Sequence, residues 1–223
     1  MQVAPLEGYR VWARSYDETP NPLTALERRT MEAWLDVRTG DRLLDAGSGT
    51  GRWMLWAAER GARVFGIDFC EEMILEAERK PRIAGRSVLA DIVAIPVRDG
   101  AFDTAICSLT LGYVSSPDCA LRELARVARR VVVSDFHPEA IARGWRRSFQ
   151  ADGTGEVHEL RHYDHTIEQI DRAAIQAGLV REWRVDASFG EPEREIFRRA
   201  GREQAFDEMR RVRAILITAW RKS

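Results

Sequence analysis

The chain has 223 residues, of which 45% are hydrophobic and 31% charged, and its formal net charge is −1. This length and apolar content suit one large or two small domains with a sizeable core, and we expect one domain. Because 34 basic and 35 acidic residues leave no positive excess, we expect neither nucleic acid nor an anionic membrane as a partner.

The first ten residues, MQVAPLEGYR, have neither the basic region nor the apolar run that opens a secretory signal. No apolar run in the sequence approaches the length of a membrane span. We therefore expect a cytoplasmic protein. Cys70, Cys107 and Cys119 are odd in number and lack the paired close spacing of a zinc site, so buried free thiols are expected.

Two short helices are expected in the lead-in 1–40. Apolar runs of strand length then alternate with helical patterns, which is typical of a parallel sheet covered on both faces. The expected strands lie at 41–46, 62–67, 87–90, 102–108 and 130–135, and the expected crossover helices at 53–60, 71–80 and 117–128.

The alternation breaks after Asp135, where about thirty residues rich in Arg, Gly and His follow. We interpret 137–165 as a candidate lid that contributes to an acceptor pocket. Thr166 and Gln169 have capping-box spacing and open a helix that closes at Gly178. A strand near 180–187, a charged helical stretch near 192–210 and a final apolar run, RAILITAW, complete a single domain over 1–223.

The stretch LDAGSGTG, residues 44–51, carries glycines at alternating positions between an expected strand and an expected helix. Such a loop brings backbone N–H groups and a helix N-terminus close to a ligand, and a nucleotide-like ligand is the default. Gly47, Gly49 and Gly51 form G-x-G-x-G, whereas the dinucleotide fingerprint needs a glycine or alanine where Arg52 stands. The spacing therefore disfavours NAD.

This stretch resembles the first motif of class I S-adenosylmethionine-dependent methyltransferases, in which an acid, here Asp45, stands two residues before the first glycine. Three further segments, VFGIDF, LADIVAIPVRDGAFD and FDTAICSLTLGYV, resemble later motifs of that family in the same order. The resemblance spans residues 9 to 135. It implies a Rossmann-like α/β fold, with a seven-stranded, mostly parallel sheet, an antiparallel edge strand and helices on both faces.

The resemblance also implies S-adenosylmethionine as the cofactor. In the family, the glycine loop passes under the methionine and ribose portions, an acid accepts the ribose hydroxyls, a second acid meets the adenine amino group, and an aromatic residue of the lead-in closes over the carboxylate end. The residues that match are Tyr16, Asp45, Gly47, Gly49, Gly51, Asp68, Phe69, Asp91, Ile92 and Ser108. Two alternatives remain: Asp45 organises only its loop, and Tyr16 belongs with Tyr9 and Trp12 to a packing stripe.

All four histidines fall between 137 and 165. His137 directly follows an expected parallel strand, and ligands of such sheets bind beyond the carboxyl ends of the strands. His162 and His165 belong to the candidate lid. A histidine titrates near neutral pH and can take the proton of a hydroxyl or acidic carbon, so we predict these three as catalytic, with ordinary hydrogen bonding as the alternative. No paired carboxylate accompanies them, and no metal site is predicted.

We therefore predict an enzyme that transfers the methyl group of S-adenosylmethionine to a small molecule by in-line displacement, which the family resemblance implies. Alternatives are another transfer from the same cofactor, of a carboxyl or aminopropyl group, and a non-catalytic cofactor-binding protein on this fold. The Asn-Pro-Pro-aromatic signature of amino-group methylation on bases is absent after the expected fourth strand, where SLTLGY stands.

Overall fold

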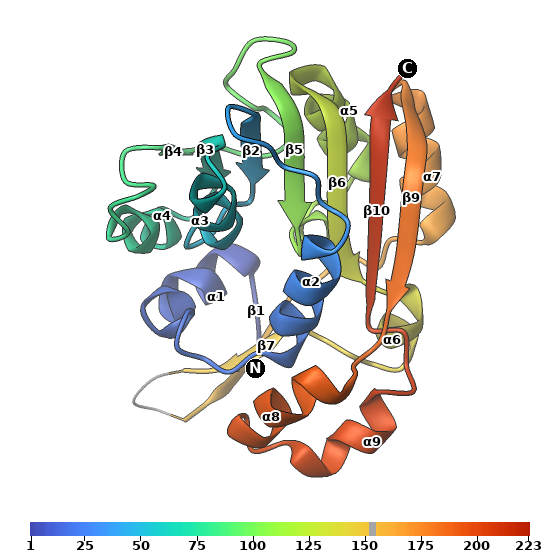
Figure 1. Ribbon diagram of the computed structural model, residues 1–223. Helices are drawn as coiled ribbons and strands as arrows, with labels where there is room; N and C mark the ends of the chain where they lie inside the picture. The colour runs from blue at the N-terminus through green and yellow to red at the C-terminus, as the bar shows by residue number, and fades with distance from the viewer. Residues whose placement is uncertain (152–154) are drawn as a thin grey trace.

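The computed structural model describes residues 1–151 and 155–223. Its main sheet has seven strands in the order β4-β3-β2-β5-β6-β10-β9 (Figure 1). These strands are β2 (Arg42–Ala46), β3 (Arg63–Asp68), β4 (Ser87–Leu89), β5 (Phe102–Ser108), β6 (Ala128–Phe136), β9 (Leu179–Ala187) and β10 (Ile215–Lys222). Each lies within two residues of a range expected from the sequence, and the predicted fold class is confirmed.

The strands from β2 to β6 pair in parallel, and β10 runs antiparallel between β6 and β9. The last two strands thus form the expected antiparallel hairpin at one edge of the sheet. The chain moves outward from β2 through β3 to β4, then returns to place β5 on the other side of β2. The loops that leave β2 and β5 diverge at this reversal, which is where ligands bind in such sheets.

Helices cover both faces of the sheet (Figure 1). One face of the sheet packs against α2, α3, α8 and α9 through buried side chains such as Leu26, Trp53, Phe197 and Phe206. The other face packs against α5 and α7. The bounds are α1 (Pro5–Trp12), α2 (Pro22–Glu32), α3 (Arg52–Glu59), α4 (Glu71–Glu78), α5 (Pro117–Val127), α6 (Pro138–Ala142), α7 (Ile167–Gln176), α8 (Glu191–Arg199) and α9 (Phe206–Met209), with short 3₁₀ turns η1 (Ala13–Ser15), η2 (Leu111–Tyr113) and η3 (Glu203–Ala205).

Local signals begin and end these helices as expected. Thr166 and Gln169 form a reciprocal capping box at the start of α7, which satisfies backbone donors that the first turn leaves free. Gly61 and Gly178 follow α3 and α7 with φ of 82° and 76°. The charged stretch near 192–210 is not one helix, because the chain turns at Gly201 (φ 66°) between α8 and η3.

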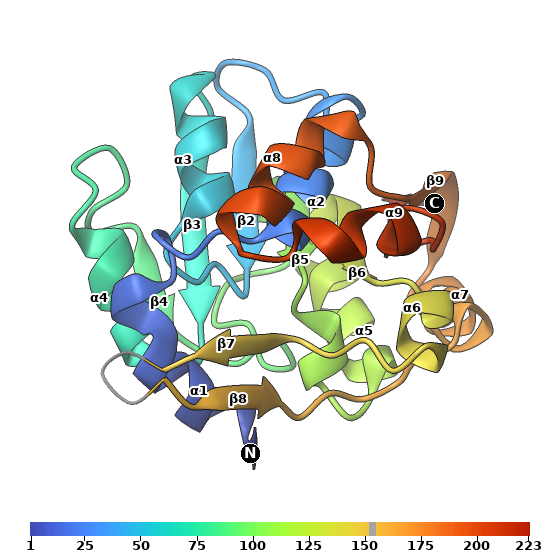
Figure 2. The same cartoon turned by 90° about the horizontal axis from the view of Figure 1, so that it is seen from below.

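The 137–165 segment is more regular than the sequence indicated. It contains α6 and two strands, β7 (Ser148–Gln150) and β8 (Val157–Leu160), and β8 pairs in parallel with β1 (Gln2–Val3) to form a second, three-stranded sheet. The rings of Phe149 and Trp12 stack with centroids 4.8 Å apart. Together with α1, this sheet extends across the end of the molecule at which the parallel strands terminate (Figure 2). Residues 152–154 of the segment lie outside the described residues.

Within the described part of the chain, no helix combines the length and apolarity needed to cross a membrane. In the same residues, His, Cys, Asp and Glu side chains nowhere gather in a group of three or more that could hold a metal ion. The three cysteines are free, as predicted: Cys70 and Cys107 are buried and Cys119 is partly buried. Burial raises the pKa of Cys70 to about 11, so this thiol stays protonated at neutral pH.

Candidate active site

A cavity, partly open to solvent, lies where β2, β3 and β5 end. Its walls come from the loops after these strands, the start of α3, and the α1, η2 and 137–165 elements. Seven of the ten predicted cofactor residues line it: Tyr16, Asp45, Gly47, Gly49, Asp68, Phe69 and Ser108. The remaining lining residues are Tyr9, Ser48, Arg52, Trp53, Met73, Leu109, Thr110, Tyr113 and Arg147.

The three glycines of the loop after β2 serve different purposes. All have positive φ: 77° at Gly47, 54° at Gly49 and 81° at Gly51. A Cβ on Gly47 would lie 2.4 Å from the Thr110 side chain, and one on Gly51 would lie 2.4 Å from Ile83 Cδ1. At Gly49 the nearest neighbour would be the end of one flexible side chain, at 3.1 Å. The outer glycines therefore let the loop pack against protein, and Gly51 lies outside the cavity lining.

Asp45 places a buried carboxylate on the cavity wall without a hydrogen-bond partner. It is 1% exposed, and both carboxylate oxygens are unpartnered in the described structure. Burial raises its pKa to about 7, and the nearby Arg52 guanidinium opposes this effect. Because an unpaired buried charge is costly, a cationic group of a ligand would stabilise the ionised form.

Asp68 ends β3 with its carboxylate held by backbone donors. Oδ2 accepts from Gly49 N–H at 2.7 Å, and Oδ1 accepts from Cys70 N–H at 2.9 Å. Burial raises the pKa of Asp68 to about 6, although these hydrogen bonds favour the ionised form. Each carboxylate oxygen has a second lone pair, so the fixed group can still accept from two adjacent hydroxyls.

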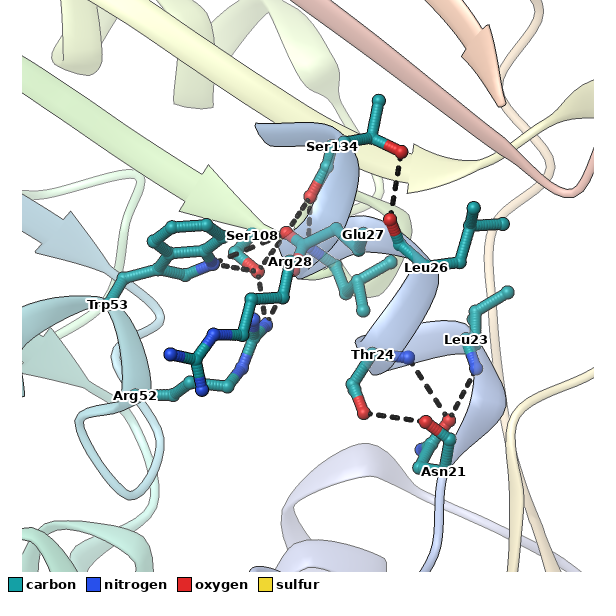
Figure 3. Close-up of polar contacts among 12 residues, drawn as sticks. Asn21, Leu23, Thr24, Leu26, Glu27, Arg28, Arg52, Trp53, Ser108 and Ser134 are labelled. Carbon is teal, nitrogen blue, oxygen red and sulfur yellow. Dashed lines mark hydrogen bonds and ion pairs between the residues drawn. The ribbon is translucent and has the colours of Figure 1, made fainter. Parts of the chain in front are cut away.

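Ser108, at the end of β5, is hydrogen-bonded to Glu27 of α2 (Figure 3). Its hydroxyl donates to Glu27 Oε1 at 2.6 Å and accepts from Arg52 Nη2 at 3.1 Å and Trp53 Nε1 at 3.2 Å. Ser134 of β6 donates to the same Glu27 oxygen, also at 2.6 Å. One carboxylate thus joins the lead-in helix to two adjacent strand ends and to the start of α3.

Glu27 was not among the residues predicted from the sequence. Its side chain is fully buried, and its Oε2 lies 2.7 Å from Arg52 Nη2. A signal did exist, because Leu23, Leu26 and Met31 mark the buried face of α2 and Glu27 lies on that face. A charged residue among apolar positions of a helix is unusual unless it is paired, and here the partners come from three other elements.

Aromatic side chains and one arginine form the opposite wall. Tyr9 of α1 donates to the Tyr113 hydroxyl at 3.0 Å, and Arg147 Nη2 donates to the Tyr16 hydroxyl at 2.6 Å. Burial raises the pKa of Tyr113 to about 12 and that of Tyr9 well above its usual value, so both phenols are neutral at physiological pH. Tyr16 lines the cavity and also packs against Trp12, so it does belong to a packing stripe, and its closure over the cofactor stays a prediction.

Asp91 and Ile92 follow β4 and do not line this cavity within the described residues. Asp91 Oδ1 accepts from Val93 N–H at 3.1 Å, and Ile92 is 5% exposed in the apolar core. β4 pairs with β3 so that Leu89 is opposite Asp68, which places Asp91 at the same edge of the sheet. Their contact with an adenine ring stays a prediction.

His137 is the N-cap residue of α6. Its Nδ1 accepts from Glu139 N–H at 3.0 Å, its Nε2 lies 3.6 Å from Asp186 Oδ1, and the residue is 3% exposed. Burial lowers its pKa, and the neutral ring is the form that accepts the capping hydrogen bond. Topology placed His137 at a strand end, but within the described residues it does not line the cavity, so its position does not support the proton-transfer role expected from the sequence.

His162 lies directly behind the cavity wall. Its ring packs edge-on against Tyr113, and its Nε2 lies 3.3 Å from Asp135 Oδ1. Burial acts to lower the pKa of His162, but Asp135 and Asp164 outweigh it and the pKa is raised. His165 Nε2 lies 2.8 Å from the carbonyl oxygen of Val114. The three predicted histidines are therefore not brought together.

The loop side of the cavity suits a zwitterionic ligand that also carries hydroxyl groups. The Asp45 carboxylate is unpartnered, and Arg52 Nη1 and Ser48 Oγ also lack partners in the described structure. All three residues line the cavity. An ammonium group would pair with Asp45, a carboxylate with Arg52, and a ribose with Asp68. These are the polar groups of S-adenosylmethionine, so the residues present fit that cofactor.

Comparison with known proteins agrees with this chemistry. Residues 44–133 match the family model described as a methyltransferase domain. This range includes the glycine loop, Asp68, Asp91 and Ser108, but neither the lead-in nor the 137–165 segment. The match therefore covers the strand ends that hold the loop side of the cavity.

Over 132 residues the chain is 36% identical to the demethylmenaquinone methyltransferase of Beutenbergia cavernae, covering 56% of this chain and 54% of that protein. It is 38% identical over 120 residues to the malonyl-[acyl-carrier protein] O-methyltransferase of Serratia marcescens, covering 52% and 45%. The chain thus spans about half the length of these relatives. A solved S-adenosylmethionine-dependent methyltransferase from Mesorhizobium loti has the same fold, with a TM-score of 0.70 and 22% identity over 91% of this chain and all of that one.

Proposed function

Since the chain belongs to the class I S-adenosylmethionine-dependent methyltransferases, we propose that it transfers the methyl group of S-adenosylmethionine to a small-molecule acceptor. The observation that carries the proposal is the arrangement of unpartnered Asp45 and Arg52 atoms beside Asp68 in one cavity. When bound, the cofactor supplies a methyl group already activated on a sulfonium. The relatives' names refer to chemically different acceptors, so the acceptor is not carried over from them.

The chain's own residues bind the cofactor and orient the acceptor. We assign Asp68 to the ribose hydroxyls of the cofactor and Asp45 to its ammonium group. The backbone of the Gly47 to Gly51 loop is assigned to close contact with the methionine and ribose portions. Phe69 lines the cavity and, with Asp91 and Ile92, is assigned to the adenine. Ser108, held by Glu27, faces the place where donor and acceptor meet. Alignment of the acceptor within this cavity is the main contribution that we expect to the rate.

The aromatic wall excludes water from the reacting groups. Tyr9, Tyr16 and Tyr113 enclose the cavity from the side of α1 and η2, and their ring faces can attract a cationic sulfur centre. His162 forms an ion pair with Asp135 behind Tyr113 and does not line the cavity in the described structure, so we assign it to the positioning of Tyr113 and not to receiving a proton. We leave His137 and His165 with structural roles.

Calorimetry with S-adenosylhomocysteine and with NAD tests the binding part of this proposal. We expect S-adenosylhomocysteine to bind and NAD not to bind. Asp68→Ala should weaken the binding of S-adenosylhomocysteine by about 1–3 kcal/mol, because the ribose hydroxyls lose a charged acceptor. Asp207→Asn, an exposed change in α9, is the control and should bind normally. Binding of NAD alone, or an unchanged affinity in folded Asp68→Ala, would contradict the assignment.

Product analysis separates methyl transfer from other uses of the cofactor. Methyl transfer releases S-adenosylhomocysteine, whereas aminopropyl transfer releases methylthioadenosine. Incubation with S-adenosylmethionine and acceptor pools, followed by mass spectrometry, should show the former. Release of methylthioadenosine would favour aminopropyl transfer, and binding without turnover across acceptor classes would favour the regulatory alternative.

A further inference from the structure

Arg147 places a buried guanidinium with unpaired N–H groups on the aromatic wall of the cavity. The residue is 4% exposed, and Nη2 donates to the Tyr16 hydroxyl at 2.6 Å. Nε and Nη1 have no hydrogen-bond partner, and the described residues provide no ion pair to this group. A buried cation without a counter-ion is costly. Since the described residues supply no anion to Arg147, a ligand in the cavity that Arg147 lines can supply one.

The surrounding side chains fix the guanidinium but do not neutralise it. Its central carbon lies 5.6 Å from the Trp12 ring centroid and 5.8 Å from that of Tyr16, distances at which cation–π attraction is effective. Tyr9 and Tyr113 are neutral phenols because burial raises the pKa of each. The position is therefore preorganised, and its charge is available to a ligand.

The carboxylate of Asp135 is engaged elsewhere. Its Oδ1 lies 3.3 Å from His162 Nε2 and accepts from Phe136 N–H at 2.7 Å. Its Oδ2 accepts from Gly112 N–H. The lone pairs of this carboxylate are thus largely occupied, and no ion pair joins Asp135 to Arg147 in the described structure.

The loop side of the cavity has its own cation. Arg52 begins α3 directly after the glycine loop, and its Nη2 pairs with Glu27. Its Nη1 is unpartnered in the described structure, so this group can still donate to the carboxylate of the cofactor. Arg147 enters from the 137–165 segment, beside Tyr9, Tyr16 and Tyr113. Two separate cations on two walls fit two separate anionic groups.

We propose that Arg147 binds an anionic group of the methyl acceptor, a carboxylate or a deprotonated oxygen, on the aromatic wall of the cavity. The proposal rests on the proposed methyl transfer and narrows its substrate class to small anionic molecules with apolar or aromatic surface. Charge-assisted hydrogen bonds from a buried arginine are stronger than neutral ones, so neutral acceptors of the same shape bind more weakly.

Benzoate and its neutral analogue benzamide are the probes, titrated by calorimetry into the full chain saturated with S-adenosylhomocysteine. We expect wild type to bind benzoate at least about tenfold more tightly than benzamide. Arg147→Gln should remove this preference, and Arg147→Lys should retain part of it because the charge remains. Arg143→Gln, an exposed arginine of the same segment, should bind as wild type does.

The outcomes separate the sources of the anion. A folded Arg147→Gln variant that binds S-adenosylhomocysteine about tenfold more weakly, with benzoate competing against it, would assign Arg147 to the cofactor carboxylate and overturn the acceptor proposal. Equal affinity of wild type for benzoate and benzamide would also overturn it, and this measurement requires no variant to fold. Failure of wild type to bind S-adenosylhomocysteine would instead count against the proposed function.

Discussion

His162 Nε2 lies 3.3 Å from Asp135 Oδ1, and this buried pair joins the 137–165 segment to the end of β6 directly behind the cavity. The approach requires a glycine at position 112, because a Cβ there would lie 1.8 Å from His162 Nε2. Burial acts to raise the pKa of Asp135, but hydrogen bonding and charge from His162 outweigh it, so the pKa of Asp135 is lowered and that of His162 is raised. The pair is therefore most stable as an ion pair.

Stability should depend on pH through this pair. The raised pKa of His162 contributes stability that is full below its unfolded value, about 6.5, and is lost as pH rises through the folded value. The lowered pKa of Asp135 contributes stability that is full above its unfolded value, about 3.9, and this stability is lost as pH falls through the folded value. His162→Gln should lower the free energy of unfolding by about 2 kcal/mol at pH 6, and by less at pH 9. Urea denaturation that gave the same difference at both pH values would contradict the ion pair.

Asp45→Asn should stabilise the ligand-free protein while weakening cofactor binding. The folded pKa of Asp45, about 7, is raised by burial, so ionisation destabilises the fold progressively as pH rises from the unfolded pKa, about 3.9, through that value. The variant should gain on the order of 4 kcal/mol at pH 8 and little at pH 4. Denaturation at both pH values measures the gain, with Asp207→Asn as control. An equal loss of unfolding free energy at both pH values would indicate that Asp45 organises only its loop.

Glu27→Gln should be strongly destabilising, because the amide leaves Arg52 without its counter-ion and cannot accept from all of its present donors. Removing one partner of a buried pair costs about 3–5 kcal/mol. Glu32→Gln is the matched control in the same helix: its ion pair with Arg28 is partly exposed, and the loss should stay below about 1 kcal/mol. Similar midpoints of urea unfolding for the two variants would show that the Glu27 network contributes little.

His137→Ala tests the cap against the proton-transfer role. Loss of the N-cap hydrogen bond should lower the free energy of unfolding by about 1 kcal/mol, and His137→Asn, which can also cap, should restore it. Turnover should change less than about threefold once an acceptor is known. A fall of about a hundredfold in kcat with unchanged stability and a shifted pH–rate profile would instead identify His137 as a general base.

The order of strands and helices and much of the loop side of the cavity could be predicted from the sequence. Apolar runs, capping residues and glycines at helix ends act over a few neighbouring positions, so they mark β2 to β6, the β9–β10 hairpin and most helices. The spacing of Gly47, Gly49 and Gly51, with acids at 45 and 68, is likewise local to strand ends. In a parallel sheet, residues that follow adjacent strands meet at one edge whatever the rest of the chain does.

Tertiary structure alone decided the other wall and the polar network behind it. Glu27 meets Ser134 across 107 positions of sequence, and Arg147 meets Tyr16 across 131. His137, by contrast, caps the N-terminus of its own helix, α6. Whether a charged side chain is paired, capped or left to meet a ligand depends on which distant groups exclude water from it. That burial arises only when separate elements pack together, so no local pattern of residues records it.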